Sequence, residues 1–464
     1  MKKKTKIIIL SLIALLLGVV GYSGGLTPQQ AGVLAIFSVS ILGTLFFWDF
    51  RLSFVFVGSG VFLLMKAVVL EDFIQFASLD VILFLIAMMI IVGMMKEAGF
   101  FYWLITVLLR VNNLDGKKLF IILMLASALF SAVMDEVTSI IVMVTVILNI
   151  CMFLEINPLP LVMCSVMATN IGSASTVLGN PVGVLIAARS SLSFEDFLSH
   201  ALPVSVLVLF VSMAILGYAY RRYIRKISTL LKEYQKDKGF LYLISIPADR
   251  KTKISIGIFA VTIFLIALHK RLELLLGVQE NTLLIMIPII SAGVVMFYRH
   301  DKARDYVEKE VEWNSLLFFM FLFAQAGVIR ATGIADFFAQ KIVATFGSSP
   351  RLLSGMVLFT AGAFSSVLDN VVTVASYIPI VKSLSALHIN LKPLWWSLLF
   401  GACYGGNITM IGSTANIVAL GLMEKDRNVK VNFYQWLKLG LLIGLVSLSI
   451  SFLVVFFLFG YFEL

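Results

Sequence analysis

The chain has 464 residues, of which 60% are hydrophobic and only 13% are charged. Soluble domains carry roughly 25% charged residues, and apolar segments of about 20 residues, long enough to cross a bilayer, recur along the whole sequence. This composition predicts an all-α polytopic membrane protein and excludes a separate soluble domain. The net charge of +10 gathers in short loops, where it indicates orientation rather than binding of nucleic acid.

The apolar segments, taken in chain order, predict eleven transmembrane spans in a scaffold interrupted by two helical hairpins. The first follows the basic sequence MKKKTK and is expected to remain uncleaved. Two spans, 158–189 and 392–424, are expected to be broken. The spans are 5–22, 30–49, 51–70, 80–97, 158–189, 201–223, 253–268, 281–298, 313–330, 392–424 and 435–460.

Basic residues in the loops orient these spans. The N-terminus, the linker at about 221–253 and the loops 299–312 and 424–430 are rich in Lys and Arg and are predicted to be cytoplasmic, whereas 71–80 has neither and is predicted to be external. The C-terminus is then external, and the membrane is expected to be a prokaryotic plasma membrane. Helices at 117–134 and 136–155 would form a hairpin that enters from the cytoplasm. Helices at 351–368 and 370–386 would form a second hairpin that enters from outside.

The sequence contains an internal repeat with an offset of 234 residues. FSAVMDEVTS at 130–139 matches FSSVLDNVVT at 364–373, and GMMKEAG at 93–99 matches GVIRATG at 327–333. NIGSASTVLGNP at 170–181 matches CYGGNITMIGST at 403–414 after one deletion. The loop charges give the two halves opposite orientations, as in many secondary transporters. We therefore divide the chain into an N-terminal helix (1–29), repeat 1 (30–223), a basic cytoplasmic linker (224–252) and repeat 2 (253–464).

Each hairpin tip places a carboxylate in the middle of an apolar run. A buried carboxylate is costly, so an acidic residue within a membrane segment indicates a functional site. The alternative is that Asp135 and Asp369 only cap the following helices, although one carboxylate can both cap and bind an ion. Glu136 either faces the site or pairs with a Lys near the membrane surface. The candidate ion-binding residues at the tips are Ser131, Asp135, Glu136, Thr138, Ser365, Asp369, Asn370 and Thr373.

The second type of polar break lies in the two broken spans, at 170–183 and 405–417. Gly tolerates non-helical backbone angles and Pro181 cannot donate a backbone hydrogen bond, so these segments are expected to expose helix ends to a substrate or ion. The alternative is a kink, or close packing through small residues. The candidate lining residues are Asn170, Ser173, Ser175, Thr176, Gly179, Asn180, Gly406, Asn407, Thr409, Gly412, Ser413, Thr414 and Asn416.

Other polar residues give weaker signals. Lys96 and Arg330 occupy equivalent positions in the repeat and could bind an anion, but the preferred interpretation is that they mark helix ends at the membrane interface. The four His residues lie in no motif, and the three Cys residues have no metal-ligand spacing. No Walker A, Gly-x-Ser-x-Gly or His-Glu-x-x-His motif is present, so an enzyme is not predicted. No cofactor is predicted apart from H⁺ or Na⁺ as coupling ion, with a Na⁺ site near Asp135 and Asp369.

Four segments resemble signature sequences of the ion transporter superfamily: SAVMDEVTSIIVMVTVI, NIGSASTVLGNPVGVLI, SSVLDNVVTVASYIPI and ACYGGNITMIGSTANIV. The resemblance covers nearly the whole chain and is strongest to the branch of arsenite permeases, NhaD-type sodium–proton antiporters and the melanosomal P protein. It implies a homodimer in which scaffold helices hold a transport domain of hairpins and broken helices. It also implies elevator-type movement of that domain.

The sequence departs from this branch at two positions. The first tip has Asp135-Glu136 where relatives commonly have Asp-Asn, and the first break has Gly179-Asn180-Pro181 where they commonly have Gly-Asp-Pro. In effect, one carboxylate has moved from the break to the tip. The tips also differ from the Ser-Asn-Thr motifs of di- and tricarboxylate carriers, so a citrate-like substrate is less favoured.

Two functional hypotheses follow from the sequence. The first is a secondary active transporter that exchanges a small cation or oxyanion against H⁺ or Na⁺ through the tip carboxylates. The second is an arsenite efflux permease, working alone or as the membrane subunit of a pump with a partner ATPase. The paired carboxylates favour the first hypothesis, because neutral arsenous acid would not require them, and nothing in the sequence indicates the ATPase.

Overall fold

The computed structural model describes residues 3–109, 113–234, 249–427 and 431–463, and within these ranges every regular element is a helix. Nine of the described helices are long and apolar enough to cross a membrane, or eleven if each of two bent pairs counts as one span. The predicted class, an all-α polytopic membrane protein, is confirmed.

The described part of the first half comprises the helices α1 (Lys3–Ser23), α2 (Pro28–Phe46), α3 (Arg51–Leu64), α4 (Leu70–Phe76), α5 (Leu79–Glu97), α6 (Phe100–Leu109), α7 (Gly116–Val133), α8 (Glu136–Phe153), α9 (Leu159–Ser173), α10 (Pro181–Ser190), α11 (Phe194–Asp196), α12 (Leu202–Ala219) and α13 (Arg221–Tyr234). A short π-helical turn, η2 (Phe197–Ala201), joins α11 to α12, and a 3₁₀ turn, η1 (Trp48–Phe50), precedes α3.

The described part of the second half comprises α15 (Arg250–Ala267), α16 (His269–Leu276), α17 (Thr282–Tyr298), α18 (Ala303–Asp305), α19 (Trp313–Ala331), α20 (Ile334–Phe346), α21 (Pro350–Ser365), α22 (Asn370–Ser383), α23 (Lys392–Gly405), α24 (Thr414–Arg427), α25 (Phe433–Phe457) and α26 (Phe459–Glu463). A π-helical turn, η3 (Tyr306–Glu310), follows α18, and a 3₁₀ turn, η4 (Leu384–Leu387), follows α22.

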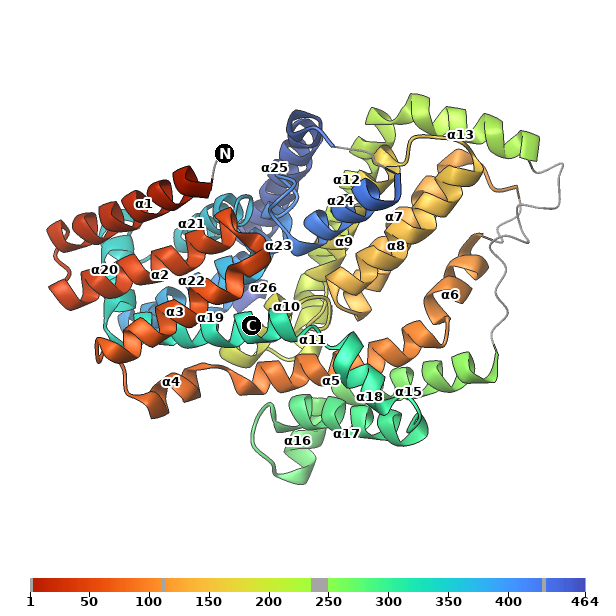
Figure 1. The fold of residues 1–464 in the computed structure, drawn as a ribbon. Coiled ribbons are helices and arrows are strands. Elements are labelled where there is room, and N and C mark those ends of the chain that lie inside the picture. Colours follow the sequence, from red (N-terminus) through yellow and green to blue (C-terminus); the bar gives the residue numbers. More distant parts are fainter. Residues whose placement is uncertain (1–2, 110–112, 235–248, 428–430, 464) are drawn as a thin grey trace.

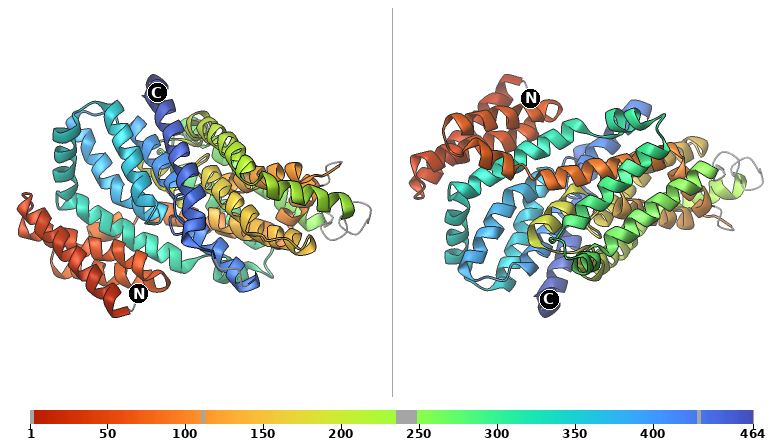
Figure 2. Two further views of the ribbon diagram at one scale, coloured as in Figure 1. Left: turned by 90° about the horizontal axis from the view of Figure 1, so that it is seen from above. Right: turned by 90° about the horizontal axis from the view of Figure 1, so that it is seen from below.

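The two hairpins lie on opposite sides of the centre of the molecule (Figure 1). The pair α7–α8 lies on one side of the molecule and the pair α21–α22 on the other (Figure 1). Helix α25, in blue, crosses between these two groups in the left view of Figure 2 and packs against α12, α21 and α23. Helix α1 lies at the margin, with most of its side chains exposed, and packs against α2. An exposed apolar helix of this kind is suited to contact with lipid.

The two repeats use the same close contact between a hairpin and a broken helix. Helix α7 packs against α9, and α21 packs against α23. At the first contact Gly172 lies against the backbone of Ala128, and at the second Gly405 lies against the backbone of Gly362. Both contacts leave no room for a Cβ atom. The glycines that the sequence placed at equivalent positions therefore serve the same packing function in each repeat.

The structure also contains helices that the predicted spans did not include. Helices α6 and α20 each begin just after a glycine with positive φ, Gly99 (φ 70°) and Gly333 (φ 77°), at equivalent positions of the repeat. They have 10 and 13 residues, too short to stand out as spans. The segment 71–80, predicted as a loop, contains most of α4, and the predicted span 51–70 ends at Leu64.

The predicted basic linker begins as a helix. Helix α13 extends to Tyr234 and packs against α7, with its apolar residues Ile227 and Leu231 buried. The rest of the linker, up to residue 248, lies outside the described residues. The division of the chain into two repeats and a linker otherwise stays a prediction.

Candidate functional site

Each hairpin turns at an aspartate that caps the helix after the turn. The Asp135 carboxylate accepts hydrogen bonds from the backbone amides of Val137 (3.1 Å) and Thr138 (2.9 Å). The Asp369 carboxylate accepts one from the amide of Val371 (3.0 Å). The helix amides at both tips thus stabilise a negative charge. Capping of α8 and α22 by the two aspartates is confirmed, and binding of an ion by them stays a prediction.

The tips of the two hairpins meet at Glu136. The side-chain amide of Asn370 donates to both carboxylate oxygens of Glu136, at 3.2 Å each. The hydroxyl of Ser413, in the second break, donates to the same carboxylate at 3.4 Å. Because Glu136 is only 2% exposed, the structure places it in the site and away from any Lys at the membrane surface. Glu136 and Asn370 are equivalent residues of the repeat, so this contact lies where the repeats face each other.

The Asp369 carboxylate lies between the second break and the scaffold. It accepts a hydrogen bond of 2.5 Å from the hydroxyl of Thr414. The Arg51 guanidinium of α3 donates a hydrogen bond of 3.0 Å to the hydroxyl of Ser315 on α19. Arg51 is buried over the rings of Trp48 (4.0 Å) and Phe318 (4.9 Å). Arg51 is thus a buried cation held between α3 and α19.

The two breaks hold the hairpins through equivalent hydrogen bonds. The hydroxyl of Thr176 donates to the carbonyl of Ala132, and that of Thr409 to the carbonyl of Ser366, its equivalent in repeat 2. The Ser365 hydroxyl donates to the carbonyl of Ala402 at 2.5 Å. Carbonyl groups left unpaired at the end of each first hairpin helix are thereby satisfied. Each break is thus hydrogen-bonded to the hairpin tip of its own repeat.

The turns of the breaks are too tight for side chains. A Cβ atom on Gly179 would lie 2.3 Å from the carbonyl oxygen of Ser173, and one on Gly412 would lie 2.8 Å from that of Gly406. The hydroxyl of Ser175 donates to the carbonyl of Gly172 (2.6 Å) and so closes the first turn. Among the predicted lining residues, these glycines and Ser175 shape the breaks.

Three asparagines connect the two breaks. The side-chain amide of Asn170 donates to the amide oxygens of Asn407 and Asn416, at 2.9 Å each. Asn416 in turn donates to the carbonyls of Gly406 and Thr409, at 2.8 Å each. All three asparagines are buried. The two interrupted helices therefore form one hydrogen-bonded unit, which the sequence alone did not indicate.

Asn180 makes local contacts in the first break. Its side-chain oxygen accepts from the amide of Gly183 (2.9 Å), and its side-chain nitrogen donates to the hydroxyl of Ser173 (2.9 Å) and to the sulfur of Cys403 (3.2 Å). Asn180 also lines a small cavity together with Asp135 and Thr138. The first tip and the first break thus share a space, although Glu136 is not among the hydrogen-bond partners of Asn180 in the described part of the chain.

Several buried hydroxyl groups near the tips have no hydrogen-bond partner in the described part of the chain. They include Ser131 Oγ, Ser139 Oγ and Thr373 Oγ1, and the last two are equivalent residues of the repeat. Buried polar groups are almost always paired, so these three hydroxyls are available as ligands for a bound cation. Hydroxyl and carboxylate oxygens are the ligands of hard cations, so these residues fit the expected Na⁺, whose binding stays a prediction.

Two residues of the site were not among the predicted ones. Arg51 stands at the start of a predicted span, where a basic residue suggests the membrane surface rather than a buried contact. Glu312 precedes α19 in a loop predicted to be cytoplasmic, yet its carboxylate accepts from Ser315 (3.2 Å) beside Arg51. No pattern in the sequence distinguishes either from ordinary loop charges.

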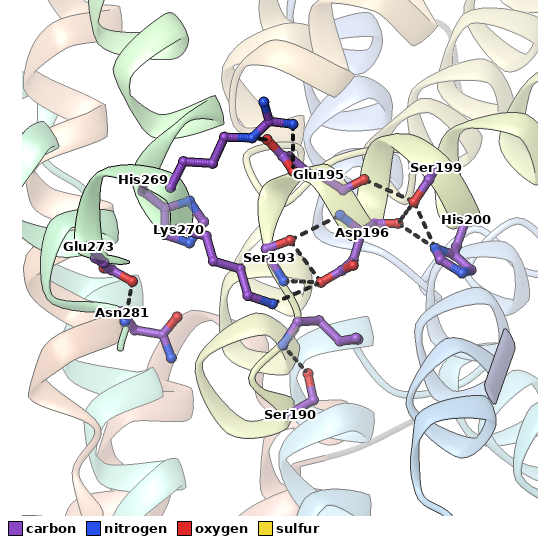
Figure 3. A network of polar contacts seen from close by, with 12 residues as sticks. Ser190, Ser193, Glu195, Asp196, Ser199, His200, His269, Lys270, Glu273 and Asn281 are labelled. Carbon is purple, nitrogen blue, oxygen red and sulfur yellow. Dashed lines mark hydrogen bonds and ion pairs between the residues drawn. The ribbon is translucent and has the colours of Figure 1, made fainter. Parts of the chain in front are cut away.

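A separate polar network joins the segment after the first break to the second repeat (Figure 3). Ser193 and Asp196 form a capping box at the start of α11. Arg271 of α16 pairs with Glu195 (2.9 Å), and Lys270 lies 4.0 Å from Asp196. His200 donates to or accepts from Ser199 and stacks on Trp396. Among the described residues, no three His, Cys, Asp or Glu side chains form a metal-binding group.

Comparison with known proteins agrees with this architecture. The family model described as a citrate transporter, CitMHS, matches residues 2–401 and 320–463. The chain belongs to the CitMHS family. An uncharacterized transporter of Mycobacterium tuberculosis is 30% identical over 377 residues, covering 80% of this chain and 84% of the relative. The P protein of Homo sapiens is 25% identical over 453 residues, covering 82% of this chain and 54% of the P protein.

A solved structure supports the fold of this CitMHS member. The YdaH transporter of Alcanivorax borkumensis, whose topology is described as unusual, aligns with a TM-score of 0.55 and 16% identity, covering 84% of this chain and 87% of YdaH. The resemblance to the ion transporter superfamily and its P-protein branch is confirmed, and the chain is a membrane transporter.

Proposed function

We propose that this CitMHS member is a secondary active transporter in which Glu136 binds the coupling H⁺ or Na⁺ between the two hairpin tips. The observation that supports the proposal is the position of Glu136, which is buried and held by an amide and a hydroxyl, with Asp135 and Asp369 as neighbours of like charge. Among the described residues, no basic side chain lies within ion-pair distance of it. A buried carboxylate without a cationic partner requires a proton or a bound cation for neutrality.

The contact between the two hairpin tips would couple binding of this ion to movement of the hairpins and breaks. Asn370 belongs to the second hairpin and Ser413 to the second break, so neutralising Glu136 changes contacts with both at once. The Asn170 link would make the hairpins and breaks move as one transport domain, as in elevator-type alternating access. The transported substrate is a small cation or oxyanion, and a homodimer is the expected assembly.

The alternative is an arsenite efflux permease with a partner ATPase. It is less favoured, because a neutral substrate driven by ATP hydrolysis needs no buried carboxylate between the tips. The two functions differ in their energy source, which an assay with purified protein and no ATPase separates.

The test is transport by the purified protein in liposomes under imposed H⁺ or Na⁺ gradients. Na⁺, Li⁺, arsenite, chloride, citrate and succinate would be screened as substrates. Gradient-driven accumulation is expected for the wild type and should be lost in Glu136→Gln. Glu273→Gln is the matched control, since Glu273 is also buried but accepts hydrogen bonds from the backbone amides of Asn281 and Leu283, at the start of α17. Full coupled transport by Glu136→Gln would contradict the proposal.

The expected movement is tested with cysteines placed beside the tips. A cysteine next to Asp135 should react with a membrane-impermeant thiol reagent from one side only and become protected when the coupling ion is added. A cysteine next to Asp369 should show the complementary pattern. Equal access from both sides, independent of ligand, would indicate a channel-like pore.

A further inference from the structure

A cavity of about 490 Å³ lies apart from the tips, at the end of α19 that carries Arg330. Its walls come from the turn between α4 and α5 and from α10, α19, α20, α22 and η4. The walls are partly apolar, with Phe76, Phe323 and Ile378 among them. Glu136, Asp135 and Asp369 are not among the lining residues, so the cavity is separate from the proposed coupling site.

Three basic side chains from three different helices converge on this cavity. They are Arg189 of α10, Arg330 of α19 and Lys382 of α22. The same three line a second cavity of about 340 Å³, which continues toward Asn390 and Lys392. A concave site where cations from separate elements meet concentrates positive potential and attracts anions.

The charges of the cavity are only partly compensated. Arg189 donates to the hydroxyl of Ser78 and lies 3.7 Å from the Asp80 carboxylate. Within the described ranges, neither Arg330 nor Lys382 has an acidic side chain within 4.0 Å, although Asp336 also lines the cavity. Lys382 lines both cavities together with Arg189 and Arg330, so three positive charges share this space. An anion between the three would offset this concentration of positive charge.

We propose that this cavity binds an organic oxyanion, with its charged head between Arg189, Arg330 and Lys382 and its apolar body against Phe76, Phe323 and Ile378. Arginine binds planar oxyanions through paired N–H donors, and lysine adds a third charge. The volume suits a small molecule. The carboxylate or phosphate could belong to a soluble anion or to a lipid headgroup, since both present the same chemistry at a membrane interface.

The cavity lies between the predicted scaffold and the predicted transport domain, so a bound anion would contact both. Arg330 lies on α19, which belongs to the predicted scaffold, whereas Arg189 and Lys382 lie on the broken helix and the hairpin of the predicted transport domain. An anion held by all three would connect these parts. Its occupancy would therefore favour the arrangement of helices described here over one in which the three cations separate.

The experiment measures equilibrium binding to the full-length protein in nanodiscs by calorimetry. The probes are benzoate, which has a charged head and an apolar body, sulfate, which has the charge alone, and benzamide, which has no charge. Benzoate is expected to bind more tightly than sulfate, and benzamide not at all. Arg330→Gln should weaken benzoate binding about tenfold, as expected for the loss of one charge-assisted hydrogen bond. Arg330→Lys should retain part of the affinity.

Arg304→Gln is the matched control, because Arg304 is an 86% exposed cation that lies outside the cavity and pairs with Glu308. Nanodiscs of zwitterionic lipid are compared with nanodiscs containing phosphatidylglycerol. Competition by phosphatidylglycerol would identify a lipid headgroup as the source of the oxyanion, and its absence would identify a soluble anion.

Equal binding of benzoate and benzamide, or affinity unchanged in both Arg330→Gln and Lys382→Gln, would overturn the proposal. This assay requires no transport. A failure here would leave the role of Glu136 intact, and loss of coupling in Glu136→Gln would not depend on the cavity.

Discussion

The contact between Gly172 and α7 allows a prediction with a defined magnitude. A Cβ atom on Gly172 would lie 2.2 Å from the carbonyl oxygen of Ala128 and 2.5 Å from its Cα atom. These distances are about 1–2 Å shorter than the optimal separation of non-bonded atoms. Because both atoms belong to the backbone of α7, no side-chain rotation can relieve the overlap, and α7 must move away from α9.

Gly172→Ala should therefore lower the free energy of unfolding by about 1–3 kcal/mol, the usual cost of overpacking. It should also reduce transport, because α7 leads directly to the tip that bears Asp135 and Glu136. The assay combines thermal unfolding of the purified protein, followed by tryptophan fluorescence, with transport in liposomes.

Gly293→Ala provides the control for this prediction. Gly293 lies inside α17, and a Cβ atom there would meet nothing within 4 Å. The alanine should raise stability slightly, by up to about 1 kcal/mol, because it has the higher helix propensity. If Gly172→Ala matched Gly293→Ala in both stability and transport, the reasoning about the α7–α9 contact would be refuted.

Three further substitutions test contacts at the tips. Thr414→Val removes the hydroxyl that donates to Asp369 and should weaken the apparent affinity for the coupling ion about tenfold. Thr414→Ser keeps a hydroxyl and should retain the affinity. Unchanged ion dependence of transport in Thr414→Val would contradict this prediction. Adding Asn180→Asp to Glu136→Gln should restore part of the coupled transport that Glu136→Gln loses, with a pH optimum different from that of the wild type; no recovery would show that the two positions do not share a site. Arg51→Gln should lower the free energy of unfolding by about 1–3 kcal/mol, because it removes the contacts with the rings of Trp48 and Phe318 and the hydrogen bond to Ser315. Arg51→Lys should recover part of this stability. A thermal midpoint of Arg51→Gln equal to that of the wild type would contradict the prediction.

The sequence predicted the hairpin turns and the breaks well because each has a local chemical signature. An aspartate in an apolar run ends one helix and caps the next, and clustered Gly, Ser and Asn interrupt a span wherever they occur. Asp135 and Asp369 occupy the turns as predicted, and α9 and α23 end within the predicted breaks. The short helices α6 and α20 were not predicted, because only apolar segments long enough to cross a membrane were assigned as spans.

Contacts between the repeats could not be predicted, because they depend on how the two halves face each other. The repeat alignment pairs Glu136 with Asn370, but it does not indicate that the two side chains touch. The sequence therefore left open whether Glu136 faced the site or a surface Lys, and the structure places it against Asn370. Likewise, Arg51 is buried because α3 packs on α19. No local sequence motif predicts that packing.

The single amide of Asn170 restricts where the molecule can bend. Broken helices are natural hinge points, since their backbones already lack regular hydrogen bonds. Here, however, both interruptions share one donor, and pulling them apart would leave buried amide oxygens on Asn407 and Asn416 unpaired, at about 1–3 kcal/mol for each group. We expect flexing to occur instead in the segments that lead into and out of this unit, such as those before α9 and after α10. A mutation that loosens one interruption should for the same reason disturb the other.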